Sequence, residues 1–198
     1  HPYEQGFDLR LVPEKLEDPI KWKKPRRIFV NSMSDLFHDK IPDEYIGRVF
    51  DVMKRAHWHT FQVLTKRPKR MRKLLRASFK SINKIKNIWW GVSIENCKHG
   101  LPRINILKDT PVSTRFLVME PLLEDLGVLN LDNIDWVIVG AESGHHARPL
   151  NLDWVRSIRD QAVAAKVPLY FKQHVVGHRK ISLPLLDSKR WTQYPKRK

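Results

Sequence analysis

The run WVIVGAE, from Trp136 to Glu142, begins with four apolar residues and then passes through glycine and alanine to a carboxylate. Tryptophan, valine and isoleucine favour β-strands, and an apolar run of this length is too short for a buried helix. We therefore predict a buried strand that presents Glu142 at its carboxyl end.

Five further runs of the same kind lie on either side of this one, at intervals of roughly 20 to 35 residues, the length of one strand-plus-helix unit. They are IFVN (Ile28 to Asn31), FQVLT (Phe61 to Thr65), WWGVSIE (Trp89 to Glu95), RFLVME (Arg115 to Glu120) and PLYFK (Pro168 to Lys172). Repetition of strand and helix requires right-handed crossovers and a mainly parallel sheet. The sequence thus predicts an α/β fold, a parallel (β/α) barrel of the TIM-barrel type over residues 28–173.

Helical patterns lie between the runs. Pro42, followed by two acidic residues and apolar residues at helical spacing, predicts the start of one helix, and Asn151 is a good N-cap for another. A shorter helix is expected over residues 97–107. Residues 1–27 are predicted to form an extended N-terminal segment, and residues 174–198 a basic, extended C-terminal tail.

Composition indicates one globular domain without membrane spans. The 198 residues are 41 % apolar, enough for a sizeable core, and no apolar stretch is long enough to cross a bilayer. No secretory leader is visible, so we expect a cytoplasmic protein. Cys97 is the sole cysteine, which excludes an internal disulfide and any metal or iron–sulfur site held by cysteines of this chain.

Polar side chains follow every predicted strand, and the carboxyl ends of parallel strands meet on one face. Carboxylates there can hold an ammonium group, and Lys or Arg can hold a carboxylate, which favours a zwitterionic ligand. A salt-bridged polar lid that binds nothing is the alternative. The predicted ligand-binding residues are Asn31, Ser32, Asp35, Thr65, Lys66, Arg67, Ser93, Glu95, Asn96, Glu120, Glu142, Ser143, Lys172 and Gln173.

The chain is strongly basic, with 37 Lys and Arg against 21 Asp and Glu, a net charge of +16. Such a charge attracts polyanions, so nucleic acid or an acidic protein is the expected partner. One basic helix is predicted near residues 68–80, and its nucleic-acid-binding candidates are Lys69, Arg70, Arg72, Lys73 and Arg76. A solvated helix face is the alternative. The sequence does not indicate an oligomeric state.

Weaker signals concern anions and metals. The run VGAESG, from Val139 to Gly144, follows a strand, and its backbone amides could meet a phosphate; a tight turn is the alternative. The histidine pairs have spacings that are poor for a metal, and we predict no metal site from them. These pairs are His57 with His59, His145 with His146, and His174 with His178.

Six phrases, taken in order, resemble the phage protein family named after mycobacteriophage gene products thirty-seven and sixty-eight. They are FVNSMSDLFH (Phe29 to His38), FQVLTKRP (Phe61 to Pro68), WWGVSIEN (Trp89 to Asn96), RFLVMEPLL (Arg115 to Leu123), DWVIVGAESG with ARPL (Asp135 to Gly144, Ala147 to Leu150) and YFKQ (Tyr170 to Gln173). The similarity extends from about Gly6 to Gln173. Members of that family are largely of unknown function and typically begin with three closely spaced cysteines, similar to the cluster-binding loop of radical S-adenosylmethionine enzymes.

The resemblance implies an incomplete parallel (β/α) barrel, like that of radical S-adenosylmethionine enzymes, whose first strand and cysteine loop precede His1. The gap would then lie beside the Ile28 to Asn31 strand. It also implies that an N-terminally extended protein holds an iron–sulfur cluster and S-adenosylmethionine, whereas this chain holds no cofactor. Two functions follow as expectations. The first is a phage or prophage radical S-adenosylmethionine-like enzyme that modifies nucleic acid, and the second is a non-catalytic basic module that binds nucleic acid or a protein partner.

Overall fold

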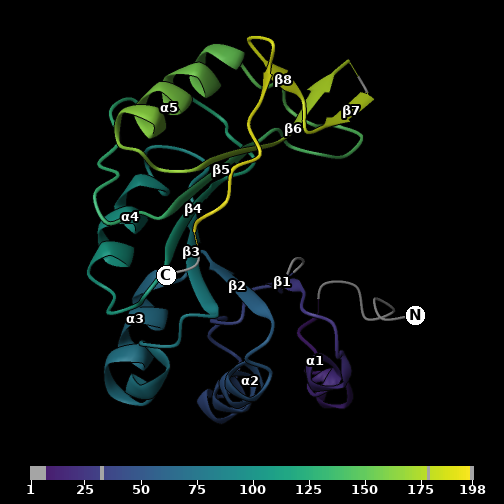
Figure 1. The fold of residues 1–198 in the computed structure, drawn as a ribbon, viewed down its shortest axis with the longest axis vertical. Helices are drawn as coiled ribbons and strands as arrows, with labels where there is room; N and C mark the ends of the chain where they lie inside the picture. Colours follow the sequence, from purple (N-terminus) through teal and green to yellow (C-terminus); the bar gives the residue numbers. More distant parts are fainter. Residues whose placement is uncertain (1–7, 32–33, 178, 197–198) are drawn as a thin grey trace.

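The computed structural model describes residues 8–31, 34–177 and 179–196, and these form a curled sheet with helices on its outer side (Figure 1). The sheet has seven strands in the order β1-β2-β3-β4-β5-β6-β7. Strands β1 to β6 pair in parallel and follow the chain order, so each crossover moves one position along the sheet. The prediction of an incomplete parallel α/β barrel is confirmed.

The elements have the following bounds. The strands are β1 Arg27–Val30, β2 Thr60–Thr65, β3 Ile88–Ser93, β4 Arg115–Met119, β5 Trp136–Gly140, β6 Leu169–Val176, β7 Arg179–Ser182, β8 Leu185–Leu186 and β9 Lys189–Arg190. The α-helices are α1 Asp18–Lys21, α2 Asp43–Arg55, α3 Pro68–Ala77, α4 Leu101–Lys108 and α5 Leu152–Ala164, and two short 3-10 helices cover Pro13–Lys15 and Lys80–Ile82. None of the helices in the described residues is both long and apolar enough to cross a membrane.

The main core lies between the outer face of the sheet and helices α2 to α5. Alternate residues of each strand point to this face, so β3 contributes Trp90 and β2 contributes Phe61, both almost fully buried. Phe50 of α2 meets Trp90 edge-on, with ring centroids 5.5 Å apart. Burial of these large side chains fixes the helices on the sheet, which in turn fixes the positions of the strand ends.

The inner, concave face of the sheet carries a second, aromatic cluster. Trp89, Phe116 and Trp136 are buried there, and Tyr170 and Tyr194 pack against them. A β-carbon at position 91 would lie 2.4 Å from the Phe116 ring, so Gly91 of β3 provides the space that this ring occupies. Aromatic side chains therefore cover the concave face of β3, β4 and β5.

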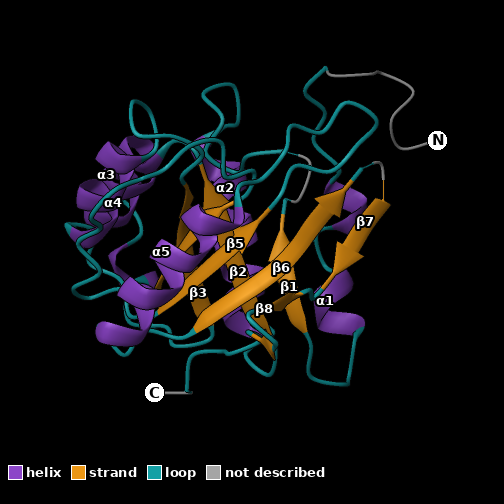
Figure 2. Ribbon diagram, turned by 90° about the horizontal axis from the view of Figure 1, so that it is seen from above, coloured by secondary structure: helices purple, strands orange, loops and turns teal. Residues whose placement is uncertain are grey.

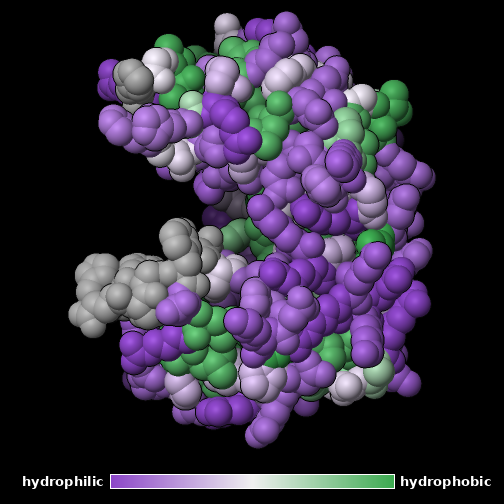
Figure 3. Space-filling view, turned by 180° about the vertical axis from the view of Figure 1, so that it is seen from behind, coloured by the Kyte–Doolittle hydropathy of each residue, from purple (hydrophilic) through white to green (hydrophobic). Residues whose placement is uncertain are grey.

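The two sheet edges are protected differently, and the gap in the barrel lies between them. Strand β1 is one edge, and β6 is covered along its carboxyl half by the antiparallel strand β7, which Figure 2 shows running against it. Along the amino half of β6 runs the C-terminal strap, residues 191–195, whose Gln193 N–H donates to the Leu169 carbonyl at 3.0 Å. Figure 3 shows the molecule deeply notched between the β1 side and the β6–β7 side.

Local signals in the sequence are largely confirmed. The Asn151 side chain caps α5 by accepting from the Asp153 N–H at 2.8 Å, and α2 begins at Asp43, directly after Pro42. The helix expected over residues 97–107 is the shorter α4.

The described parts of the two terminal segments, residues 8–27 and 174–196, contain regular structure where the sequence predicts extended chain. Between residues 8 and 27 lie the first 3-10 helix and α1. Beyond residue 173, β6 continues to Val176 and β7, β8 and β9 follow. Asp187 and Ser188 join β8 to β9 with positive φ angles of 51° and 64°, as a tight two-residue hairpin turn requires. Asp187 also pairs with Arg156 and Arg159, so α5 holds this hairpin in place. Pairing and docking of this kind involve residues far apart in sequence, which local patterns do not reveal.

Candidate functional site

The first network at the carboxyl edge is centred on Asp35, in the loop after β1. Its Oδ1 accepts from the Phe37 N–H at 2.9 Å and from the Thr65 hydroxyl at 2.7 Å. Its Oδ2 accepts from the Lys66 N–H at 2.9 Å and from Arg67 Nη1 at 3.2 Å. Both oxygens are thus occupied, so Asp35 ties the loop after β1 to the end of β2 and positions the residues that follow.

The second network is centred on Glu95, just after β3 and 7 % exposed. Lys66 Nζ lies 2.5 Å from Oε1, and Arg103 Nη1, on α4, lies 2.8 Å from Oε2 and 2.6 Å from the Ser93 carbonyl. Burial raises the pKa of the Glu95 carboxyl, but hydrogen bonds and positive charge from Lys66 and Arg103 outweigh it, so the pKa lies below its ordinary value. Glu95 is an anion held between two cations.

Sequence reasoning did not identify Arg103 as part of this site. It lies inside the predicted helix, where a basic residue is unremarkable, and α4 brings it back over the carboxyl end of β3. The predicted crossover helix was the available signal. A helix that follows a parallel strand begins near the carboxyl end of that strand, so side chains of its first turn lie close to the strand end.

The third network joins β4 to β6 across β5. Lys172 Nζ of β6 lies 2.9 Å from Glu120 Oε1, directly after β4. Gly140 of β5 lies next to this pair. A β-carbon at position 140 would come within 3.3 Å of the Glu120 carboxyl group and of the Gln173 side chain. The glycine therefore allows the ion pair to cross the intervening strand. The Lys172 side chain remains 51 % exposed, so its ammonium faces solvent at the mouth of the half-barrel.

The fourth carboxylate, Glu142, points into its own loop. Arg148 binds it at 2.7 Å through both Nε and Nη2, and these bonds lower the pKa of Glu142 to about 2. Ser143 is exposed in the same loop. Glu142 is thus engaged within residues 142–148 rather than paired across the strand ends.

The other predicted site residues have local roles. Asn31 Nδ2 donates to the Ser34 hydroxyl at 2.6 Å, and Asn96 Oδ1 accepts from the His99 N–H at 2.8 Å. Gln173 is buried and donates to the Ala141 carbonyl at 2.7 Å, tying β6 to the loop after β5. Ser32 lies outside the described residues.

The basic helix α3 uses its arginines to bind neighbouring parts of the protein. Arg70 donates to the His38 carbonyl, to the Ile41 carbonyl at 2.6 Å and to Asp43 at 2.5 Å. Arg72 pairs with Asp109 at 3.2 Å, and Arg76 donates to the Asp109 carbonyl at 2.6 Å. Lys69 and Lys73 are exposed and form no ion pair with another described residue, so their charge is uncompensated there. Three of the five predicted nucleic-acid contacts on α3 thus have structural partners.

Metal-ligating groups do not cluster in the part of the chain that the structure describes: no three His, Cys, Asp or Glu side chains there could hold one ion. The Cys97 thiol donates to the Asp125 carbonyl at 3.3 Å. Burial and the neighbouring Glu124 raise the pKa of this thiol, which disfavours the thiolate that metals bind.

The arrangement leaves two separate ion-paired groups at one mouth: Lys66 with Glu95 and Arg103, and Lys172 with Glu120. Both present a carboxylate beside an ammonium that is more than half exposed. A ligand with its own ammonium and carboxylate groups could exchange partners with these pairs, because each new pair would replace one that is lost.

Comparison with known proteins identified one family. The sequence model of DUF5131, described as a protein of unknown function, matches residues 2–195. No curated protein and no solved structure was found to match.

Proposed function

The chain belongs to the DUF5131 family, and we propose that it binds S-adenosylmethionine at the carboxyl edge of the half-barrel and acts on nucleic acid. The resemblance of its strand-end phrases to the radical S-adenosylmethionine-like phage family supports this proposal. The single structural observation that carries it is the Lys172–Glu120 pair, held across β5 above Gly140 and open to solvent.

The amino-acid part of S-adenosylmethionine is a zwitterion. In this proposal Glu120 takes its ammonium and Lys172 takes its carboxylate, and the Lys66–Glu95 pair offers a second set of charges on the neighbouring strands. The Asp35 network holds the loop after β1 and the end of β2, so Lys66 is presented from a fixed backbone. Preorganised charges of this kind bind a ligand without the cost of assembling them.

An iron–sulfur cluster does not fit the residues of this chain. Its one cysteine, Cys97, holds its proton through burial and the neighbouring Glu124, and such a cluster needs several thiolates. We therefore assign radical chemistry only to a protein in which the three-cysteine segment is present, and to this chain we assign ligand binding and positioning.

Isothermal titration calorimetry with S-adenosylmethionine tests the proposal. Glu120→Gln and Lys172→Met each remove one charge from the proposed contacts and keep a similar volume, and we expect each to weaken binding at least about tenfold, or ~1.4 kcal/mol. Glu142→Gln is the matched control, since it removes the same charge from a pair inside a loop and should leave affinity unchanged. Equal loss in Glu120→Gln and Glu142→Gln would refute the assignment of the site.

A second candidate function is a non-catalytic module that binds nucleic acid. The net charge of +16 favours it, because the acidic residues of the chain cannot neutralise its cations. An experiment on a protein that carries the three-cysteine segment distinguishes the enzyme from the non-catalytic module. That protein is reconstituted with iron in the absence of oxygen. Cleavage of S-adenosylmethionine under reduction supports the enzyme, whereas retained nucleic-acid binding without S-adenosylmethionine binding supports the module.

A further inference from the structure

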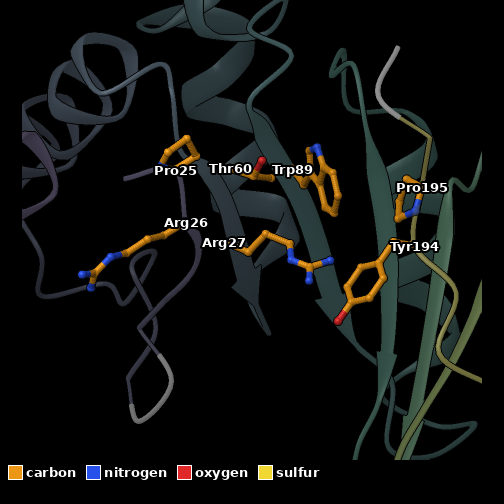
Figure 4. A pocket seen from close by; sticks show the side chains of 7 residues that line it. All are labelled: Pro25, Arg26, Arg27, Thr60, Trp89, Tyr194 and Pro195. Atoms are coloured by element: carbon orange, nitrogen blue, oxygen red, sulfur yellow. The ribbon is translucent and has the colours of Figure 1, made fainter. Parts of the chain in front are cut away.

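A small cavity lies at the amino-terminal end of the strands, opposite to the mouth. It has a volume of about 280 Å³ and lies between the starts of β1, β2 and β3 and the C-terminal strap (Figure 4). Arg26, Arg27, Thr60, Trp89 and Tyr194 are among its lining residues. Figure 4 shows Arg27 reaching from β1 toward Tyr194 on the strap, so the first strand and the strap, far apart in sequence, meet here.

A second, larger pocket of about 600 Å³ lies beside the first. It is formed by the end of α5 and the strap, and Tyr194 lines both pockets. Lys166, Lys189 and Lys196 contribute to this second pocket, together with Trp191. The two pockets share Tyr194, and together they are lined by five cationic side chains and by no Asp or Glu.

Aromatic rings, rather than carboxylates, hold several of these cations in place. The Arg27 guanidinium lies 3.7 Å from the centre of the Tyr194 ring, and Lys189 Nζ lies 4.3 Å from the centre of the Trp191 ring. A ring attracts a cation through its quadrupole but does not neutralise its charge. None of these five cations forms an ion pair with another described residue, so no described carboxylate compensates their charge. Asp187, in the turn between β8 and β9, pairs with Arg156 and Arg159 instead.

We propose that this strap path, Arg26, Arg27, Lys166, Lys189 and Lys196 around Tyr194, binds the phosphate backbone of a single-stranded nucleic acid. The inference rests on the proposed function, whose substrate class it narrows. Several cations in a row favour a polymer of phosphates over a single anion, and a positively charged groove that follows the backbone is the usual device for single strands. Pockets of this volume are the size of small-molecule sites, so they admit single nucleotide units rather than a duplex.

Fluorescence anisotropy with a labelled single-stranded oligonucleotide tests the path. The variant combines Arg27→Gln, Lys166→Gln and Lys189→Gln, which removes three charges from both pockets. The matched control combines Lys54→Gln, Lys80→Gln and Lys84→Gln, which removes three exposed charges from α2, the second 3-10 helix and the loop after it. We expect the path variant to weaken binding at low salt and to reduce the slope of log affinity against log salt by about 2, since each single-strand phosphate contact contributes about 0.7. The control should keep the wild-type slope.

The same titrations separate this inference from the function on which it rests. Equal losses in the path variant and the control would show that binding follows net charge alone, which overturns the path but leaves nucleic-acid binding intact. A wild-type protein that binds no oligonucleotide would overturn both. Tighter binding of the duplex of the same sequence, or saturation of the protein by a free mononucleotide that displaces the oligonucleotide, would also overturn the single-strand proposal. Circular dichroism melting of both triple variants confirms that each is folded.

Discussion

At the mouth of the half-barrel, Lys66 and Lys172 each lie beside a carboxylate, whereas at its opposite end Arg27 and Lys189 lie over aromatic rings. The first arrangement cancels charge locally and can exchange with a zwitterion. The second holds cations in position while leaving their charge uncompensated. Two groups of basic residues that look alike in sequence therefore suit different ligands.

A similar contrast separates α3 from the strap. Arg70, Arg72 and Arg76 of α3 bind aspartates or carbonyl groups of neighbouring loops, so the most basic helix of the chain contributes much of its charge to the fold. The segments around the strap, residues 21–27 and 189–198, are at least as basic in sequence as α3. Yet Arg26, Arg27, Lys166, Lys189 and Lys196 form no ion pair with a described residue. Local density of Lys and Arg is thus a poorer guide to a binding surface than the pairing of each cation.

The largest effect should come from removing the negative charge of Glu95, which pairs with Lys66 and Arg103 at the mouth of the half-barrel. Glu95→Gln leaves Arg103 and Lys66 without their shared anion, and we expect the free energy of unfolding to fall by about 2 kcal/mol, below the usual range for fully buried pairs because Lys66 is half exposed. Urea denaturation measures this loss. The control is Glu142→Gln, which removes the same charge from an exposed pair and should change stability far less.

The pKa of Glu95 makes the same prediction testable by pH. The folded-state pKa lies below the ordinary value, so the pair stabilises the fold above the unfolded pKa of about 4.3, and that contribution is lost as the pH falls through the folded pKa. Wild-type stability should therefore drop more steeply than that of Glu95→Gln below about pH 4.3. Parallel pH profiles for the two proteins would contradict the assignment.

An intermediate effect is expected on α3. Arg70→Ala removes the donor to two loop carbonyls and to Asp43, and should cost about 1–2 kcal/mol of stability while leaving oligonucleotide affinity nearly unchanged. Lys73→Ala, one turn further along the same helix, should change stability little, since the side chain is exposed and Ala is a strong helix former. A large loss of nucleic-acid affinity in Arg70→Ala with unchanged stability would return α3 to the role that the sequence predicts for it.

The smallest effect concerns the ionisation of Tyr170, which packs near Tyr194 of the strap and can be followed by ultraviolet absorption. Burial and the hydrogen bond with Tyr194 raise the pKa of Tyr170 to about 12. Because the folded pKa lies above the unfolded value of about 10, the neutral phenol stabilises the fold below pH 10 and that contribution is lost between about pH 10 and 12. Ultraviolet titration of tyrosinate should show one such late-titrating group, and Tyr194→Phe should lower its pKa. A late-titrating group whose pKa is the same in Tyr194→Phe as in the wild type would show that the two hydroxyls are not coupled.

The sequence by itself determined the fold class, because the signals involved are local. Short apolar runs such as WVIVGAE favour strands through their β-branched and aromatic residues, and Asn151 and Pro42 mark helix starts through their own backbone preferences. It also placed Lys66, Glu95, Glu120 and Lys172 at one edge, since parallel strands bring their carboxyl ends together.

Tertiary structure alone decided which charges meet. Lys172 of β6 pairs with Glu120 across β5, where Gly140 leaves space beside the Glu120 carboxyl group. Arg103 pairs with Glu95 because α4 begins near the carboxyl end of β3, and Glu142 pairs instead with Arg148. The strap path depends on contact between residues near both ends of the chain, where Tyr194 meets Arg27. Such contacts are set by packing over long sequence separations, and periodicity and composition carry no record of them.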